Sequence, residues 1–124
     1  MTQKWDFFPF RELKCCCCGE MHMDDVFMCS LVALREEAGF AFPVTSAFRC
    51  PRHNHSVSHT GFTGPHTTGK AVDIQISGES AARLIKLALA HGFNGIGIRQ
   101  HGDWDKRIVH LDTLNRPYQT IWTY

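Results

Sequence analysis

The segment 70–76, KAVDIQI, alternates its side chains with the period of two that is typical of a β-strand. Val72 and Ile74 point to one face, and Asp73 points to the other. Because the apolar face has to pack against a core, we expect Asp73 to face a cleft or solvent. His66 precedes the strand in the same stretch, GPHTTGKAVDI, so an imidazole and a carboxylate lie close together in the sequence. This pair is the strongest candidate for a functional site.

The same alternation places His110 and Asp112 on one face of a strand predicted at 107–112. Together with His66 and Asp73, His110 would complete a set of nitrogen and oxygen donors. Such a set is typical of a catalytic zinc ion, which keeps its fourth position open for water. A structural zinc ion more often has four protein ligands that include cysteines. The donor set therefore indicates hydrolysis rather than metal storage.

The chain has 124 residues, enough for one domain with a single core. Capping residues and apolar spacing predict helices at 24–38 and 79–91. We expect an α+β domain with a mainly antiparallel central sheet flanked by helices. The remaining predicted segments are an irregular N-terminal arm at 1–22, strands at 43–48, 70–76, 95–98 and 107–112, and a long polar loop at 51–68.

Charge and hydropathy argue against two classes of partner. The formal net charge is +1, so we expect no nucleic-acid partner. No run approaches the roughly 18 apolar residues that suggest a transmembrane helix, so we expect no stable membrane insertion. The N-terminal segment MTQKWDFFPFRELKC lacks an apolar region followed by a small-residue cleavage site. We therefore expect the chain to be made in the cytoplasm without a signal peptide. We also expect it to be a monomer.

The cysteines allow two interpretations. One is a disulfide between the run of consecutive cysteines and Cys50, formed after export. The other is a reduced thiol cluster that binds a soft metal, although the paired C-x-x-C spacings of standard zinc motifs are absent. Some could simply be small buried residues; we favour one disulfide that involves Cys50. The six positions are Cys15, Cys16, Cys17, Cys18, Cys29 and Cys50.

Three motifs resemble those of a known family. They are S-x-F-R at 46–49, H-x-x-G-x-A-x-D at 66–73 and H-x-D at 110–112. With them, the chain resembles the zinc peptidases of bacterial cell walls, the D-alanyl-D-alanine carboxypeptidases and L-alanyl-D-glutamate endopeptidases. The resemblance runs from about Phe7 to Pro117 and implies the fold shared with the hedgehog signalling domain.

The resemblance implies roles for individual residues. His66, Asp73 and His110 match the ligands of a Zn²⁺ ion. Arg49 matches an arginine that steadies the substrate carbonyl in the carboxypeptidase branch. An arginine beside a developing oxyanion would add electrostatic stabilisation.

The general base departs from the family pattern. Many members carry Glu or Asp three residues before the last histidine, where this chain has Arg107. Arginine stays protonated and cannot accept a proton. We expect Asp105, on the loop that leads to His110, to serve as the base ahead of Asp112. Asp112 could instead orient a metal ligand.

These features together predict a zinc-dependent peptidase that acts on peptidoglycan stem peptides. We favour an endolysin-like L-alanyl-D-glutamate endopeptidase, because the small, single-domain form without an anchor resembles the lytic members of the family. The alternatives are a D-alanyl-D-alanine carboxypeptidase, a metal-bearing binding module without catalysis, and a metal or redox protein built on Cys15 to Cys18. Since the substrate lies outside the membrane, we expect release to the periplasm and wall through a holin-type pore or another non-classical route.

Overall fold

The structure is a computed structural model that describes residues 3–124. A central sheet of five strands has the order β1-β2-β4-β3-β5. The first four strands in this order pair antiparallel, and β5 pairs parallel to β3. The strands are β1 (Val44–Ser46), β2 (Ala71–Gln75), β3 (Gly95–Arg99), β4 (Ile108–Asp112) and β5 (Thr120–Thr123).

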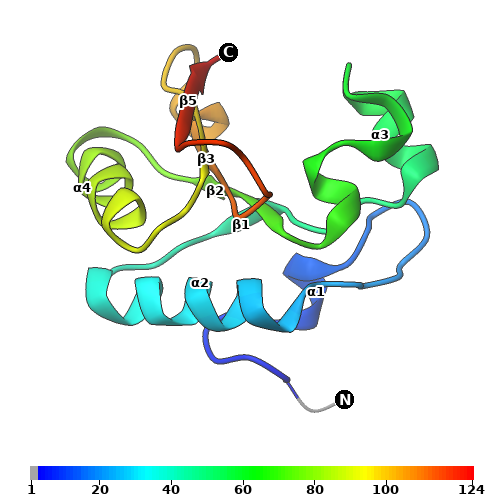
Figure 1. Cartoon of the computed structure of the whole chain (residues 1–124), viewed down its shortest axis with the longest axis horizontal. Helices are drawn as coiled ribbons and strands as arrows, with labels where there is room; N and C mark the ends of the chain where they lie inside the picture. Colours follow the sequence, from blue (N-terminus) through cyan, green and yellow to red (C-terminus); the bar gives the residue numbers. More distant parts are fainter. Residues whose placement is uncertain (1–2) are drawn as a thin grey trace.

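Helices lie around this sheet (Figure 1). In Figure 1, α2 runs beneath the sheet, and α3 and α4 lie at opposite ends of the molecule. Within the described residues, the helices are too short or too polar to span a bilayer. The α-helices are α1 (Phe10–Leu13), α2 (Asp25–Ala38), α3 (Pro51–Val57) and α4 (Gly78–Ala90), and the 3-10 turns are η1 (Gly61–Thr63), η2 (Pro65–Thr68) and η3 (Trp104–Lys106).

The core lies on the face of the sheet that carries the apolar residues of the alternating strands. In β2, for example, Val72 and Ile74 are fully buried. One contiguous cluster joins these strand residues to α2 and α4. The interior positions with no exposed area include Met28, Leu31, Leu34, Val72, Ile74, Leu84, Ala88, Phe93, Ile96, Val109 and Leu111. This packing leaves the opposite face of the sheet free to carry polar side chains.

The long helix α2 begins and ends where its sequence predicts. The carboxylate of Asp24 accepts a hydrogen bond from the backbone N–H of Phe27 at 2.8 Å, which satisfies one of the free N–H groups at the helix start. Gly39 ends the helix in the left-handed conformation. The α+β class and the mainly antiparallel sheet are confirmed.

The prediction of a loop at 51–68 was wrong, because this segment contains α3, η1 and η2. Helix α3 has no apolar stripe that could be read from the sequence. It is held instead by Asn54, which is fully buried. The Asn54 side chain donates hydrogen bonds to the Thr60 hydroxyl at 2.8 Å and to the Gly61 carbonyl at 2.6 Å. Buried polar contacts therefore fold this segment.

The two ends of the described chain are also more ordered than the sequence indicated. The N-terminal arm is mostly irregular, but it contains the single turn of α1 and buries Trp5, Phe8 and Leu13 in the core. After 107–112 the sequence predicted no further strand, whereas β5 extends the sheet beside β3. This last strand adds side chains to the polar face.

Candidate active site

A row of paired residues crosses the polar face of the sheet. Asp73 on β2 pairs with His110 on β4, and His110 pairs in turn with Gly97 on β3. Gly97 pairs with Trp122 on β5. Asp73 and His110 are buried, with 8% and 2% of their surface exposed. Strand alternation and register therefore place a carboxylate and an imidazole side by side, as the sequence predicted.

His66 reaches the same point from η2. Its Nε2 atom lies 3.2 Å from Oδ1 of Asp73. Its Nδ1 atom lies 2.8 Å from the backbone carbonyl of Ala47, which can only accept a hydrogen bond. The hydrogen of the neutral ring is therefore on Nδ1, and the lone pair of Nε2 points at Asp73.

His110 shows the same arrangement with its two nitrogens exchanged. Its Nε2 atom lies 2.7 Å from Oδ2 of Asp112, so Nε2–H donates to that carboxylate. Its Nδ1 atom lies 3.0 Å from Oδ1 of Asp73. In the neutral ring, Nδ1 then carries a lone pair directed at Asp73. Both histidines thus have their orientation and tautomer fixed by an acceptor behind them, as is usual for metal-ligating histidines.

This donor set fits a zinc ion. Nε2 of His66, Oδ1 of Asp73 and Nδ1 of His110 all lie within 4.8 Å of one another. Zinc ligands at about 2.0–2.1 Å in a tetrahedron are about 3.3 Å apart, close to the 3.2 Å and 3.0 Å distances from Asp73 to the two rings. Lone pairs that converge in this way repel one another unless a cation lies between them.

Electrostatics at the site also favour a positive charge. Burial opposes charge on His110, but hydrogen bonds to Asp112 and Asp73 raise the pKa of its imidazole. Burial likewise opposes charge on Asp73, but the His110 and His66 rings, which donate hydrogen bonds to it when protonated, hold the pKa of this carboxyl well below its usual range. The site therefore keeps an ionised carboxylate and stabilises a proton or a metal ion beside it.

Asp112 lies behind His110 and is itself fully buried. Its Oδ1 and Oδ2 atoms also accept hydrogen bonds from Arg116, at 3.2 Å from Nε and 2.8 Å from Nη2. Burial opposes its ionisation, but the hydrogen bonds to His110 and Arg116 lower the pKa of Asp112. Both oxygens are occupied and no surface is exposed, so Asp112 is placed to orient His110 rather than to accept a proton from water.

Arg49 is held beside the donor set. Its Nη2 atom lies 3.6 Å from Oδ2 of Asp73. Its Nε atom donates to the Ser46 hydroxyl at 3.1 Å, and Nη1 donates to Oδ1 of Asn54 at 3.2 Å. These contacts fix the guanidinium at the edge of the site, where the resemblance had placed it. Sequence reasoning missed Asn54, which positions Arg49 and orders α3.

A cleft of about 710 Å³ opens over the donor set. Asp73 is the single carboxylate that lines it, within the described chain. Two further arginines line the cleft besides Arg49, namely Arg99 and Arg116. The Nε atom of Arg99 is buried and has no hydrogen-bond partner among residues 3–124. The cleft is therefore suited to a ligand that carries carboxylates.

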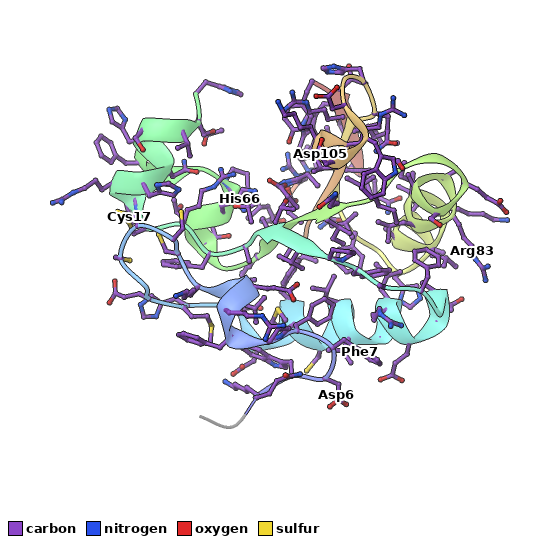
Figure 2. All side chains as sticks on the ribbon, turned by 180° about the vertical axis from the view of Figure 1, so that it is seen from behind. Asp6, Phe7, Cys17, His66, Arg83 and Asp105 are labelled. Carbon is purple, nitrogen blue, oxygen red and sulfur yellow. The ribbon has the colours of Figure 1, made fainter. Side chains whose placement is uncertain are left out.

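Asp105 is not among the residues that line this cleft. It lies on η3, its surface is exposed, and Figure 2 shows it on a different segment from His66. Arg107 follows on the same turn and donates to the Gly102 carbonyl from Nε and Nη2. The structure brings His66, Asp73, His110, Asp112 and Arg49 together and leaves Asp105 apart from them.

Trp122 on β5 and Tyr124, which follows the strand, form a wall of the cleft. The Trp122 ring lies 5.2 Å from the His110 ring. Gly97 makes room for this wall, since a Cβ atom there would lie 2.7 Å from Nε1 of Trp122 and 2.9 Å from the hydroxyl of Tyr124. Sequence reasoning missed these residues, although the alternation in TIWT at 120–123 was a weak signal for a strand.

Comparison with known families gives one match over most of the chain. A family model described as Peptidase M15 matches residues 8–112. The match includes Arg49, the three candidate ligands and Asp112. Comparisons with curated proteins and with solved structures gave no significant match.

Proposed function

The chain belongs to the peptidase M15 family, and we propose that it is a zinc-dependent peptidase that cuts the stem peptides of peptidoglycan. The observation that carries this proposal is the convergence of lone pairs from His66, Asp73 and His110 at the floor of the cleft. When bound there, zinc supplies Lewis acidity, which polarises a carbonyl and lowers the pKa of bound water to roughly 7.

The residues around the ligands have separate tasks. Asp112 holds the imidazole of His110 in one orientation through the 2.7 Å hydrogen bond. The guanidinium of Arg49, fixed by Ser46 and Asn54, is placed to stabilise negative charge that develops on a substrate carbonyl oxygen. Because these donors are held before substrate arrives, little reorganisation is required during the reaction.

Arg99 is the group that we assign to substrate recognition. Its buried Nε has no hydrogen-bond partner in the described part of the chain, and a buried unsatisfied donor costs about 1–3 kcal/mol. A carboxylate bound in the cleft would satisfy this donor. Stem peptides carry carboxylates at D-glutamate and at their C-terminus, and both fit a cleft lined by arginines.

A proton acceptor has to come from the cleft or from a segment that moves towards it. Within the described chain the lining offers no carboxylate apart from the ligand Asp73, but it includes the imidazole of His59. We therefore propose His59 as the group that transfers a proton to the leaving amine. Asp105, the base expected from the sequence, stays a prediction that direct substitution has to test.

Within this function we propose cleavage between L-alanine and D-glutamate, as in endolysins, with D-alanyl-D-alanine carboxypeptidase activity as the alternative. Incubation with purified muropeptides and mass spectrometry of the products distinguishes them. Endopeptidase activity leaves a single L-alanine on the sugar, whereas carboxypeptidase activity releases only the terminal D-alanine. Release of neither product would contradict the proposal. Monomeric state and release through a holin-type pore stay predictions.

A second candidate function is a binding module that holds the metal but does not hydrolyse its ligand. It is favoured by the lack of a free carboxylate among the lining residues of the described chain. Binding of stem peptide by the zinc-loaded protein, with no product after prolonged incubation, would support this function against hydrolysis.

A further inference from the structure

A second group of metal-binding side chains lies outside the cleft. The Sγ atoms of Cys15, Cys18 and Cys50 lie within 4.8 Å of one another. All six cysteines are described, and all are free thiols, so the structure does not form the disulfide to Cys50 that we expected from the sequence. Figure 2 shows the neighbouring Cys17 on the N-terminal loop beside α3. None of these thiols has a task in the proposed hydrolysis.

The run of cysteines forms a tight turn closed by backbone hydrogen bonds. The N–H of Cys15 donates to the Glu20 carbonyl at 2.7 Å, and the N–H of Gly19 donates to the Cys15 carbonyl at 2.8 Å. Gly19 has φ of 76°, a left-handed conformation that glycine adopts without strain. The turn brings the first and fourth cysteines of the run to one side.

Cys50 approaches this turn from the segment before α3. Its backbone N–H donates to Sγ of Cys15 at 3.3 Å. Its own Sγ atom accepts a hydrogen bond from the N–H of His53 at 3.4 Å. Sulfur atoms that accept backbone hydrogen bonds are stabilised as thiolates, and the thiolate is the form that binds metals.

We propose that Cys15, Cys18 and Cys50 hold a structural zinc ion, separate from the ion in the cleft, with its fourth ligand supplied by Cys17 or His53. Soft thiolate ligands select zinc over the hard cations. Four protein ligands that include cysteines close the shell and leave no position for substrate. The site would therefore stabilise the fold without taking part in hydrolysis.

Cys17 and His53 are the candidates for the fourth ligand, and either side chain would have to turn towards the ion, because the group within 4.8 Å contains only the other three thiols. Burial raises the pKa of the Cys17 thiol, and the nearby Cys50 thiol raises it further. His53 follows Cys50 at the same spacing that separates Cys18 from Cys15, and its Nε2 atom lies 3.2 Å from Sγ of Cys16. The positive charge of the Arg52 guanidinium offsets part of the rise in the pKa of the Cys17 thiol.

The environment of Cys15 agrees with a ligand role. Burial opposes its ionisation, but backbone N–H groups, first that of Cys50 and then those of the turn, lower the pKa of the Cys15 thiol to about 7. Cys15 is 1% exposed.

The position of the thiols explains what such an ion would do. Cys50 is adjacent to Arg49, which borders the cleft, and Cys15 belongs to the N-terminal arm. The arm meets this segment again where the N–H of Phe48 donates to the Leu13 carbonyl at 3.2 Å. A metal bound between them would fix the arm against the segment that positions Arg49.

Metal content of the purified full chain tests the proposal. Under reducing conditions we expect about two zinc ions per chain, and about one after Cys18→Ser, Cys50→Ser or His66→Ala. Cys18 is exposed, so its substitution leaves the core packing intact. Cys29→Ser is the matched control, because Cys29 is an exposed cysteine on α2 that does not belong to the group. Two zinc ions retained in Cys18→Ser and Cys50→Ser would overturn the assignment.

Cobalt substitution gives a readout that does not depend on activity. Co²⁺ in the reduced protein should show thiolate-to-metal charge-transfer absorption that His66→Ala keeps and Cys18→Ser loses. The double variant Cys17→Ser/His53→Ala keeps the three thiolates, so its absorption should shift and weaken, and the two single variants identify the fourth ligand. Absence of the absorption from the unsubstituted protein would contradict the proposal, as would an air-stable Cys15–Cys50 disulfide in protein purified without metal chelators.

Discussion

Oδ1 of Asp73 lies 3.0 Å from Nδ1 of His110, and the two residues face each other directly across adjacent antiparallel strands. Their separation is therefore set by the spacing of the sheet rather than by a loop. A ligand pair built in this way is rigid, since neither residue can move without breaking the pairing of β2 with β4.

The first prediction concerns the metal ligands. His66→Ala and His110→Ala should each abolish peptidase activity and remove the zinc ion of the cleft, because two remaining donors hold zinc weakly. Zinc per chain and cleavage of muropeptides are the measurements. His101→Ala is the control, since His101 is exposed and does not line the cleft. Full zinc content in both variants would contradict the assignment of His66 and His110 as zinc ligands.

The second prediction concerns Asp112. Asp112→Asn keeps the shape of the side chain but removes the charge that holds His110 and Arg116. Loss of such a partner typically lowers metal affinity or activity about 10–100-fold. Competition with a chelator of known zinc affinity measures the change. Asp103→Asn is the control on an exposed position. Unchanged affinity with a large loss of turnover would indicate that Asp112 handles protons instead.

The third prediction separates the two candidates for the proton acceptor. Because His59 lines the cleft and Asp105 does not, we expect Asp105→Asn to retain activity within a few-fold. His59→Ala should lower kcat by the roughly 10²–10⁴-fold that a positioned base contributes, with zinc still bound. Steady-state kinetics with zinc analysis on both variants decides between them. The opposite result would assign the role to Asp105.

The fourth prediction concerns Arg99. Arg99→Gln should lower kcat/KM mainly through KM, by about 10–100-fold, because a hydrogen bond to a charged group contributes about 1.5–3 kcal/mol. The loss should disappear with stem peptides whose carboxylates are amidated. Arg107→Gln serves as the matched control, since its guanidinium binds the Gly102 carbonyl. Equal losses on amidated and unmodified peptides would exclude carboxylate recognition by Arg99.

The fifth prediction concerns Gly97. An added methyl group would meet Trp122 and Tyr124 at under 3.0 Å, so Gly97→Ala should destabilise the fold by about 1–3 kcal/mol, as overpacking does. Denaturant unfolding measures the loss. In Gly97→Ala/Trp122→Ala the crowding is relieved, and the combined loss should be smaller than the sum of the single losses. Strict additivity would show that Trp122 is not the source of the strain.

The sequence predicted the parts of the site that follow from strand alternation. Asp73 and His110 face away from the core because their neighbours are apolar, and one register makes them partners. Helix α2 was predictable from its caps and apolar residues. These features depend on local patterns that are visible without any knowledge of tertiary contacts.

Other parts of the fold and of the two sites depend on contacts between segments that are distant in the sequence. Asn54 folds α3 and holds Arg49, but nothing near it in the sequence indicates burial. Strand β5 is short and half exposed, so its pattern is weak until β3 is available as a partner. The cluster of three thiols likewise joins Cys15 and Cys18 on an N-terminal turn to Cys50, and the sequence spacing alone does not predict this contact.

The edge position of β5 affects which parts of the cleft can change in sequence without disturbing the metal ligands. This strand lies at the edge of the sheet, so within residues 3–124 one side of its backbone has no partner strand, whereas Asp73 and His110 lie on interior strands. Substitutions at Trp122 and Tyr124 would change the wall of the cleft while leaving the pairing of β2 with β4 intact. The preference for one stem peptide over another can therefore change while the residues that carry out cleavage stay the same.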